Sequence, residues 1–262
     1  MIGIFDSGVC GMTVAHAIEK LLPDFQIIYF GDLARSPYGS KSRETIVKYS
    51  IDNSAFLLSH GAKVIIIACN SAASVASETL RQKFNVPIFE VITPAVERAV
   101  AISKSGNIGV IGTRATIRST IYEEKIKQLK PDFRVYSKAC PLLVPLVEEG
   151  WSNTRETKMV LRKYLTPLKQ KQVDTLVLGC THYPLLKDPI HHRMGKTRVN
   201  LIDSSIEVAH TLQDHLKKSP EFADSLLKGN SNKYFVSDIT EAALKTAEKI
   251  FGRQINLEKE KV

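Results

Sequence analysis

Short apolar runs alternate with amphipathic stretches along almost the whole 262-residue chain. Runs such as 64–68 (VIIIA) and 175–179 (TLVLG) are apolar at nearly every position, so both faces of such a strand would be buried. This pattern is typical of parallel strands that helices cover on both sides, and it disfavours an open antiparallel sheet. Repeated alternation of strand and helix patterns therefore predicts an α/β fold with mainly parallel sheets.

The strand-like segments are Ile2–Phe5, Gln26–Phe30, Lys63–Ala68, Pro87–Val91, Asn107–Ile111, Phe133–Ser137, Val173–Leu178, Val199–Ile202 and Tyr234–Ser237. Amphipathic helices are expected at Ser42–His60, Ala72–Lys83, Pro94–Ser103, Thr116–Leu129 and Thr154–Gln170. The tail after about Glu207 adds a helix, a strand and a second helix. This tail either crosses back to complete a first domain or extends a second one.

The chain also contains a faint internal repeat. Residues 2–7 (IGIFDS) have an echo in residues 108–113 (IGVIGT), which begin 106 residues later. In residues 64–71 and again in residues 176–182, an apolar strand is followed by a cysteine and then by polar residues. These two cysteines are 111 residues apart. Two echoes at nearly equal spacing favour a duplicated unit.

Composition excludes several classes of protein. Hydrophobic residues make up 44% and charged residues 24% of the chain, as in ordinary soluble globular proteins. The net charge of +9 is not concentrated in basic runs interleaved with aromatics, so we expect no nucleic-acid partner and attribute the charge to solubility or to attraction of an anionic substrate. We see no bilayer-spanning apolar stretch and no secretory signal, and we therefore expect a cytoplasmic protein without a membrane partner.

Four cysteines, at positions 10, 69, 140 and 180, are widely separated and form no CxxC pair. Because disulfides are disfavoured in the cytosol, each is either a buried apolar residue or a functional thiol. The histidines and cysteines lack the spacing of a metal site, and the glycine-rich fingerprints of nucleotide-binding loops are missing. We therefore expect neither a metal nor a cofactor.

Cys69 and Cys180 stand in matched settings at the carboxyl ends of predicted strands, where open α/β sheets bind ligands. Asp6, Ser7 and Thr113 fall at equivalent ends. A helix is expected to begin just after each cysteine. The positive end of a helix favours an anion, and we expect it to lower the thiol pKa from about 8.5 toward neutrality.

Polar side chains next to the cysteines have two interpretations. Asn70, Ser71 and Thr181 either bind a substrate or only cap helices. Asp6 and His182 either tune and relay the proton of a neighbouring thiol, or serve as a helix cap and a structural histidine. The loop 29–41, rich in glycine, proline and polar groups, is a further place for function.

Two symmetric half-sites would present both thiols across one bound substrate. One thiolate would remove a proton from one face of a carbon, and the other thiol would return a proton to the opposite face. Such a pair inverts a stereocentre without moving one base around the substrate.

The motifs, taken in order, resemble those of the glutamate racemases within the aspartate/glutamate racemase superfamily. The matching stretches run from residue 3 to residue 205 and read GIFDSGVCGMTV, YFGDLARSPYGSKS, ACNSAAS, VITPAV, IGTRATIRSTIY, CPLLVPLVEEGW, LGCTHYPLL and IDSS. The most specific are LGCTHYPLL and the ordered pair FDSG and ACN.

The resemblance implies two pseudo-symmetric α/β domains, residues 1–95 plus 207–262 and residues 96–206, with the active site in the cleft between them. It also implies cofactor-independent interconversion of L- and D-glutamate, which supplies D-glutamate for bacterial peptidoglycan and so for cell-wall synthesis and cell shape. A homodimer is one open possibility for its assembly. An aspartate racemase and a non-catalytic amino-acid-binding relative are the alternatives.

By the same resemblance, Cys69 is the base that acts on the D-isomer and Cys180 the base that acts on the L-isomer. Asp6, His182 and Glu148 match assisting catalytic residues. The expected substrate-binding residues are Asp6, Ser7, Tyr38, Gly39, Asn70, Ser71, Thr113, Thr116, Thr181 and His182. Four positions depart from the family pattern: Cys10 and Glu90 where glycine is usual, Ser71 for threonine and Ala73 for serine.

Overall fold

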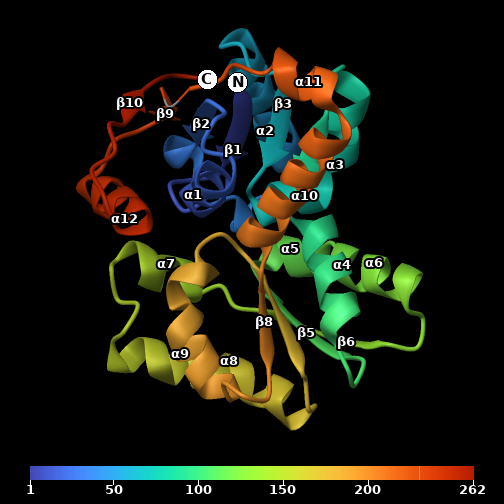
Figure 1. The fold of residues 1–262 in the computed structure, drawn as a ribbon. Helices are drawn as coiled ribbons and strands as arrows, with labels where there is room; N and C mark the ends of the chain where they lie inside the picture. Colours follow the sequence, from blue (N-terminus) through green and yellow to red (C-terminus); the bar gives the residue numbers. More distant parts are fainter. Residues whose placement is uncertain (230) are drawn as a thin grey trace.

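The computed structural model describes residues 1–229 and 231–262, and its strands form two parallel sheets that lie one above the other in Figure 1. The first sheet has the strand order β10-β9-β2-β1-β3-β4. Its strands are β1 (Ile2–Asp6), β2 (Ile27–Gly31), β3 (Val64–Ile67), β4 (Ile88–Glu90), β9 (Lys233–Val236) and β10 (Glu258–Lys259).

The second sheet repeats the arrangement of the first. Its strands are β5 (Asn107–Gly112), β6 (Arg134–Ala139), β7 (Thr175–Gly179) and β8 (Asn200–Asp203), in the order β6-β5-β7-β8. The first four strands of the chain follow the same order, β2-β1-β3-β4, and the strand pairs of both sheets are parallel. The predicted α/β class is confirmed, and the matched order agrees with the internal repeat.

Helices cover the sheets. They are α1 (Met12–Leu21), α2 (Arg43–Ser59), α3 (Asn70–Lys83), α4 (Ile92–Ile102), α5 (Arg114–Arg118), α6 (Ile121–Leu129), α7 (Leu143–Glu148), α8 (Arg155–Gln170), α9 (Lys187–Met194), α10 (Ser204–Lys218), α11 (Pro220–Ser225) and α12 (Glu241–Phe251). Short 3-10 turns lie at η1 (Leu33–Arg35), η2 (Tyr38–Ser40) and η3 (Tyr183–Leu186). None of the helices in the described part of the chain is both long and apolar enough to cross a membrane.

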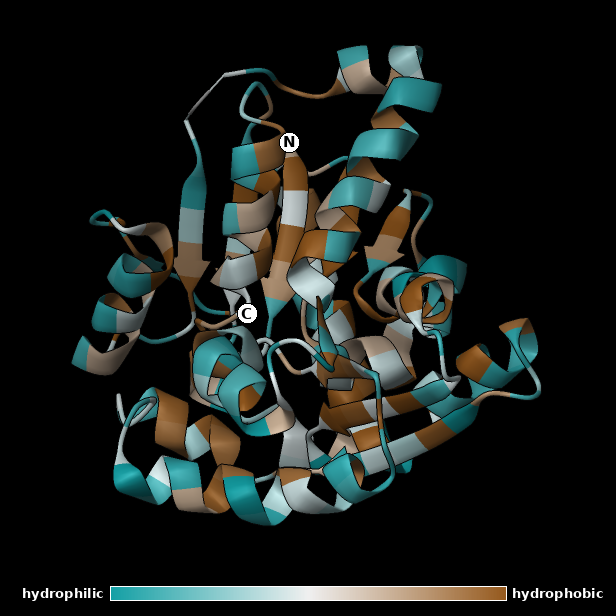
Figure 2. Ribbon diagram, turned by 60° about the horizontal axis from the view of Figure 1, so that its bottom comes forward, coloured by the Kyte–Doolittle hydropathy of each residue, from teal (hydrophilic) through white to brown (hydrophobic). Residues whose placement is uncertain are grey.

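The core follows the central strands. Every residue of β1, β2, β3 and β7 is buried, because helices pack against both faces of their sheets. Figure 2 shows the strand that begins at the N-terminus mostly in the colours of hydrophobic residues, while many residues of the outer helices are hydrophilic. In α8 the buried leucines Leu161, Leu165 and Leu168 share one face.

Two local features differ from the sequence prediction. The segment expected to be one helix over Thr116–Leu129 is divided into α5 and α6, because Thr120 adopts the left-handed conformation with φ 58° and interrupts the helical hydrogen bonding. The two-residue strand β10 was not expected, and it pairs with β9 through Glu258 and Lys259.

The tail crosses back to the first sheet, where β9 pairs with β2. The chain passes between the sheets twice, from β4 into α4 and from β8 into α10, and these two helices pack against each other. At the first passage the carboxylate of Glu90 accepts hydrogen bonds from the backbone N–H groups of Ile92 and Thr93, so it caps α4. The exact domain limits stay a prediction.

Candidate active site

Equivalent strands of the two sheets present the two cysteines. Cys69 follows β3 and forms the N-cap of α3, and Cys180 directly follows β7. Both side chains are buried, at 4% and 5% exposure, and both thiols are free. The duplicated topology therefore aims one thiol from each half at the junction of the halves.

One small cavity between the halves contains both cysteines in its wall. Its volume is about 20 Å³, which is room for about one water molecule. The lining residues are Ser7, Pro37, Tyr38, Gly39, Cys69, Asn70, Ser71, Thr113, Val144, Cys180, Thr181 and His182. A larger hollow of about 510 Å³ between α8 and α9 has neither cysteine in its wall. An amino acid would enter the cysteine cavity only if the two halves moved apart.

The surroundings of Cys69 favour its thiol form. Its Sγ donates to Oγ of Ser7 at 3.5 Å. Burial, together with the nearby charge of Asp6, raises the pKa of Cys69 to about 12. The expectation that the helix start lowers this pKa toward neutrality is wrong: the Ser7 hydroxyl and the N–H of Ala72 do lower the pKa, but the loss of solvation raises it by more.

His182 connects Cys180 to a carboxylate. Its Nδ1 lies 3.6 Å from Sγ of Cys180, and its Nε2 lies 3.0 Å from Oε1 of Glu148. Burial lowers the pKa of His182, but electrostatic interactions and hydrogen bonds with the Cys10 and Cys180 thiol groups raise it more, so the net pKa is well above the ordinary value. Glu148 itself lies outside the cysteine cavity, where it lines a hollow between α7 and α12.

Asp6 is fully buried at the end of β1, behind the cavity rather than in its wall. Its Oδ2 accepts the N–H groups of Gly8 and Gly11 at 3.0 and 3.1 Å, and Thr181 donates to its Oδ1 at 3.4 Å. Burial raises the pKa of Asp6, against the lowering effects of His182 and these N–H groups. Asp6 thus shapes the turn before α1 and also contacts the second half.

A cluster of hydroxyl groups joins the halves beside the cysteines. Oγ of Ser71, from α3, lies 2.8 Å from Oγ1 of Thr113, which caps α5 by accepting the N–H of Thr116 at 3.2 Å. Thr116 contacts this pair through its own hydroxyl but is not in the cavity wall. Thr113 therefore caps α5 and also lines the cavity, while its role in substrate binding stays a prediction.

The amide of Asn70 is held from the second half. Its Oδ1 accepts the hydroxyl of Tyr122 at 2.7 Å, and its Nδ2 lies 3.5 Å from Oγ of Ser204. Neither partner was expected from the sequence, because no local pattern connects α3 with residues 52 and 134 positions away.

Of the residues expected in the site, ten line the cysteine cavity, while Asp6, Thr116 and Glu148 support residues that do. Pro37 and Val144 also line the cavity, although no sequence motif predicted them there, and no pattern in the sequence connected Cys10 with His182. Cys10 is buried beside His182, and each affects the pKa of the other. Within residues 1–229 and 231–262, no group of three or more His, Cys, Asp or Glu side chains is placed to hold a metal ion.

Comparison with known proteins agrees with this arrangement. A glutamate racemase of Geobacter metallireducens is 44% identical over 99% of this chain and 98% of its own length. The crystal structure of the RacE1 isoform of glutamate racemase from Bacillus anthracis has a TM-score of 0.93 at 35% identity, covering 100% of this chain and 97% of the other.

The glutamate racemase from Francisella tularensis, solved in complex with D-glutamate, has a TM-score of 0.90 at 35% identity and covers 99% of this chain and 97% of its own. The family model described as Asp/Glu/Hydantoin racemase matches residues 10–212. The chain, with its two parallel sheets and paired cysteines, belongs to the Asp/Glu/hydantoin racemase family.

Proposed function

We propose that the protein interconverts L- and D-glutamate without a cofactor, with Cys69 and Cys180 as its two bases. The observation that carries this proposal is that equivalent strands of a duplicated fold bring both thiols to one cavity. Relatives that are called glutamate racemases and span nearly the whole chain support the choice of substrate.

In the proposed reaction, the Cys69 thiolate takes the α-proton of D-glutamate and becomes a thiol. The Cys180 thiol then donates its proton to the opposite face of the α-carbon and becomes a thiolate. L-Glutamate reacts by the reverse path, so each group is an acid in one direction and a base in the other. No electron is transferred, and the proton count balances in each step.

Ionisation of Cys69 needs a nearby positive charge, because burial raises the pKa of this thiol to about 12. The ammonium group of a bound amino acid brings a positive charge near the thiols, and an opposite charge favours the ionised form. His182, whose pKa is raised, supplies a second positive charge next to Cys180. We assign His182 as an assisting residue on this basis, and Glu148 because it contacts His182. We assign Asp6 because it holds Thr181 of the cavity wall, although its charge opposes ionisation of Cys69.

The site is closed around a cavity of about 20 Å³, so binding requires the halves to separate and close again over the substrate. Closure excludes water, which strengthens the electrostatic interactions with the reacting carbon. We further propose that the product D-glutamate serves bacterial peptidoglycan synthesis in the cytoplasm, as the family resemblance implies.

The direct test is racemisation of glutamate in D₂O by the purified protein without pyridoxal phosphate or added metal. With two bases, the first product molecules carry solvent deuterium while recovered substrate keeps its α-hydrogen. Folded protein that neither racemises glutamate nor exchanges its α-hydrogen would overturn the proposal. Early exchange of recovered substrate at the rate of product formation would instead indicate a single base.

Cysteine variants test the assignment of the bases. Cys69→Ser and Cys180→Ser should each lower racemisation by about 10²- to 10⁴-fold, the usual contribution of a positioned acid or base. Because the enantiomers have equal free energies in water, each variant must lose kcat/KM equally in both directions. Cys140→Ser, which removes a buried thiol outside the cavity, is the matched control.

The alternatives have separate outcomes. An aspartate racemase would turn over aspartate at least as fast as glutamate, whereas we expect aspartate to react far more slowly. A non-catalytic relative would bind glutamate without exchanging its α-hydrogen.

A further inference from the structure

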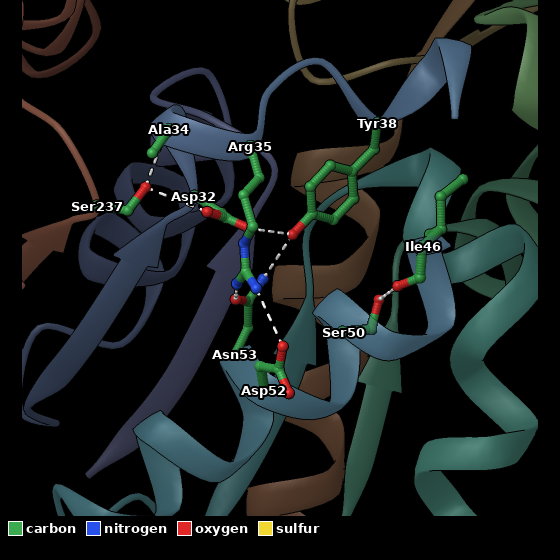
Figure 3. Close-up of polar contacts among 9 residues, drawn as sticks. All are labelled: Asp32, Ala34, Arg35, Tyr38, Ile46, Ser50, Asp52, Asn53 and Ser237. Atoms are coloured by element: carbon green, nitrogen blue, oxygen red, sulfur yellow. Dashed lines mark hydrogen bonds and ion pairs between the residues drawn. The ribbon is translucent and has the colours of Figure 1, made fainter. Parts of the chain in front are cut away.

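A closed ring of hydrogen bonds lies behind the cavity wall, in the first half of the molecule. Arg35 donates from Nε to Oδ2 of Asp32 at 2.6 Å and from Nη2 to Oδ1 of Asn53 at 2.8 Å. Nδ2 of Asn53 donates to the phenol oxygen of Tyr38 at 3.0 Å, and the Tyr38 hydroxyl donates to the same Oδ2 of Asp32. Figure 3 shows these four side chains converging from the loop after β2 and from α2.

The donor and the acceptor of every hydrogen bond in the ring can be assigned without conflict. Burial and the Asp32 carboxylate raise the pKa of Tyr38, so its hydroxyl stays protonated and donates to Asp32. The Tyr38 oxygen is then left to accept from Asn53. Asp32, Asn53 and Tyr38 are at most 1% exposed, so a broken ring leaves buried polar groups without partners.

The C-terminal tail contacts this ring from outside. Ser237, just after β9, donates from Oγ to Oδ1 of Asp32 at 3.1 Å and accepts the N–H of Ala34 at 2.8 Å. Both contacts are drawn in Figure 3. The tail therefore holds both the carboxylate of the ring and the start of the loop that carries Tyr38.

The other side of this loop touches the second half of the molecule. Tyr38 and Gly39 belong to the wall of the cysteine cavity. Gly39 packs so closely on Thr113 that a Cβ at this position would lie 2.6 Å from Cβ of Thr113. The phenol of Tyr38 is thus fixed from behind while the backbone of the same turn closes the cavity in front.

We infer that Asp32, Asn53 and Ser237 are positioning residues for substrate binding, which they control by holding the Tyr38–Ser40 turn in place. None of the three lines the cavity, so they act through Tyr38. This inference rests on the proposed racemase function. A fixed Tyr38–Ser40 turn contributes equally to binding of the substrate and of the transition state. Loosening this turn therefore raises KM and leaves kcat nearly unchanged.

The experiment compares Tyr38→Phe and Ser237→Ala with the wild type, measuring kcat and KM for both enantiomers of glutamate. We expect KM to rise about five- to tenfold in each variant, with kcat within about twofold of the wild type. The double variant should raise KM by less than the product of the single effects, because both changes break the same network.

Tyr234→Phe is the matched control. Tyr234 is also a buried tyrosine, and its hydroxyl donates to Oε2 of Glu19 at 3.0 Å, far along the chain from the cavity residues. We expect this variant to lose stability without a change in KM. If the ring only stabilised the fold, Tyr38→Phe and Ser237→Ala would also lose stability without a change in KM. That outcome would overturn the inference.

Hydrogen–deuterium exchange keeps this test separate from the proposed function. Amides of residues 36–41 should exchange faster in Tyr38→Phe and Ser237→Ala than in the wild type, whatever the substrate is. If the wild type does not racemise glutamate, the proposed function fails, and this measurement still decides whether the ring holds the turn. Unchanged amide exchange at residues 36–41 in both variants would show that the ring does not hold the turn.

Discussion

Nε2 of His182 lies 3.0 Å from Oε1 of Glu148, so this carboxylate is placed to stabilise the protonated imidazole in addition to Cys10 and Cys180, which raise its pKa. Glu148→Gln keeps the shape of this contact and removes its charge. We expect the pKa of His182 to fall and the racemisation rate to drop about tenfold or more. Titration of the imidazole nitrogens by NMR, together with kcat for both enantiomers, measures both effects.

Glu149→Gln is the control for this change, because Glu149 is exposed and makes no side-chain contact with His182 in the described structure. It removes the same charge one residue further along the chain. Equal effects of the two variants on the pKa of His182 would show that general surface charge, rather than the contact with Glu148, sets the protonation of the imidazole.

The pH dependence of Cys69 alkylation follows from its pKa of about 12. In a protein in which Cys10, Cys140 and Cys180 are replaced by alanine, only the Cys69 thiolate reacts with iodoacetamide. Raising the pH increases the thiolate fraction about tenfold per unit until the pKa is reached. We expect the rate to climb from pH 7 to 10 without levelling off, whereas the denatured chain should level off above about pH 8.5. A plateau between pH 8 and 9 in the folded protein would contradict this.

Asp6→Asn should change the same reactivity in a defined direction. The charge of Asp6 contributes to the raised pKa of Cys69, so removing it should lower this pKa and speed alkylation at neutral pH. Racemisation should nevertheless fall, because an amide replaces the carboxylate that accepts the N–H groups of Gly8 and Gly11. Alkylation at an unchanged or slower rate would show that Asp6 does not act on Cys69.

Much of the fold could be predicted from the sequence because its main signals are local. The apolar runs 64–68 and 175–179 identify buried parallel strands, and the cysteine after each run places both thiols at strand ends. The break at Thr120 could not be predicted, since the helical pattern continues on both sides of this residue and no glycine or proline marks its left-handed conformation.

Thr120 also gives a prediction about stability. A β-branched residue is strained at φ 58°, whereas asparagine tolerates this conformation better. Thr120→Asn should therefore raise the free energy of unfolding by about 0.5–1 kcal/mol without changing racemisation. The control is Thr154→Asn, at a helix N-cap with φ −74°, where no such strain is relieved. Chemical denaturation of both variants gives the comparison.

The candidate site could be predicted only where its residues adjoin a motif. Ser7, Asn70 and Thr181 follow strand ends and lie in the cavity wall, as expected. The contacts of Asp32 with Ser237 and of Asn70 with Tyr122 connect residues 205 and 52 positions apart, and no periodicity marks them. The raised pKa of Cys69 was also missed, because burial depends on the closed packing of both halves.

Gly39→Ala tests how closely the two halves must meet at the cavity. An added Cβ would lie 2.6 Å from Cβ and 2.8 Å from Cγ2 of Thr113, and both of these atoms belong to a side chain that is short and buried. The turn must then move away from the second half, so we expect KM for glutamate to rise at least about tenfold, with a smaller loss of stability. Ser40→Ala, an exposed change in the same turn, should leave both quantities close to the wild type. Wild-type KM in Gly39→Ala would mean that the halves need not come this close for the substrate to bind.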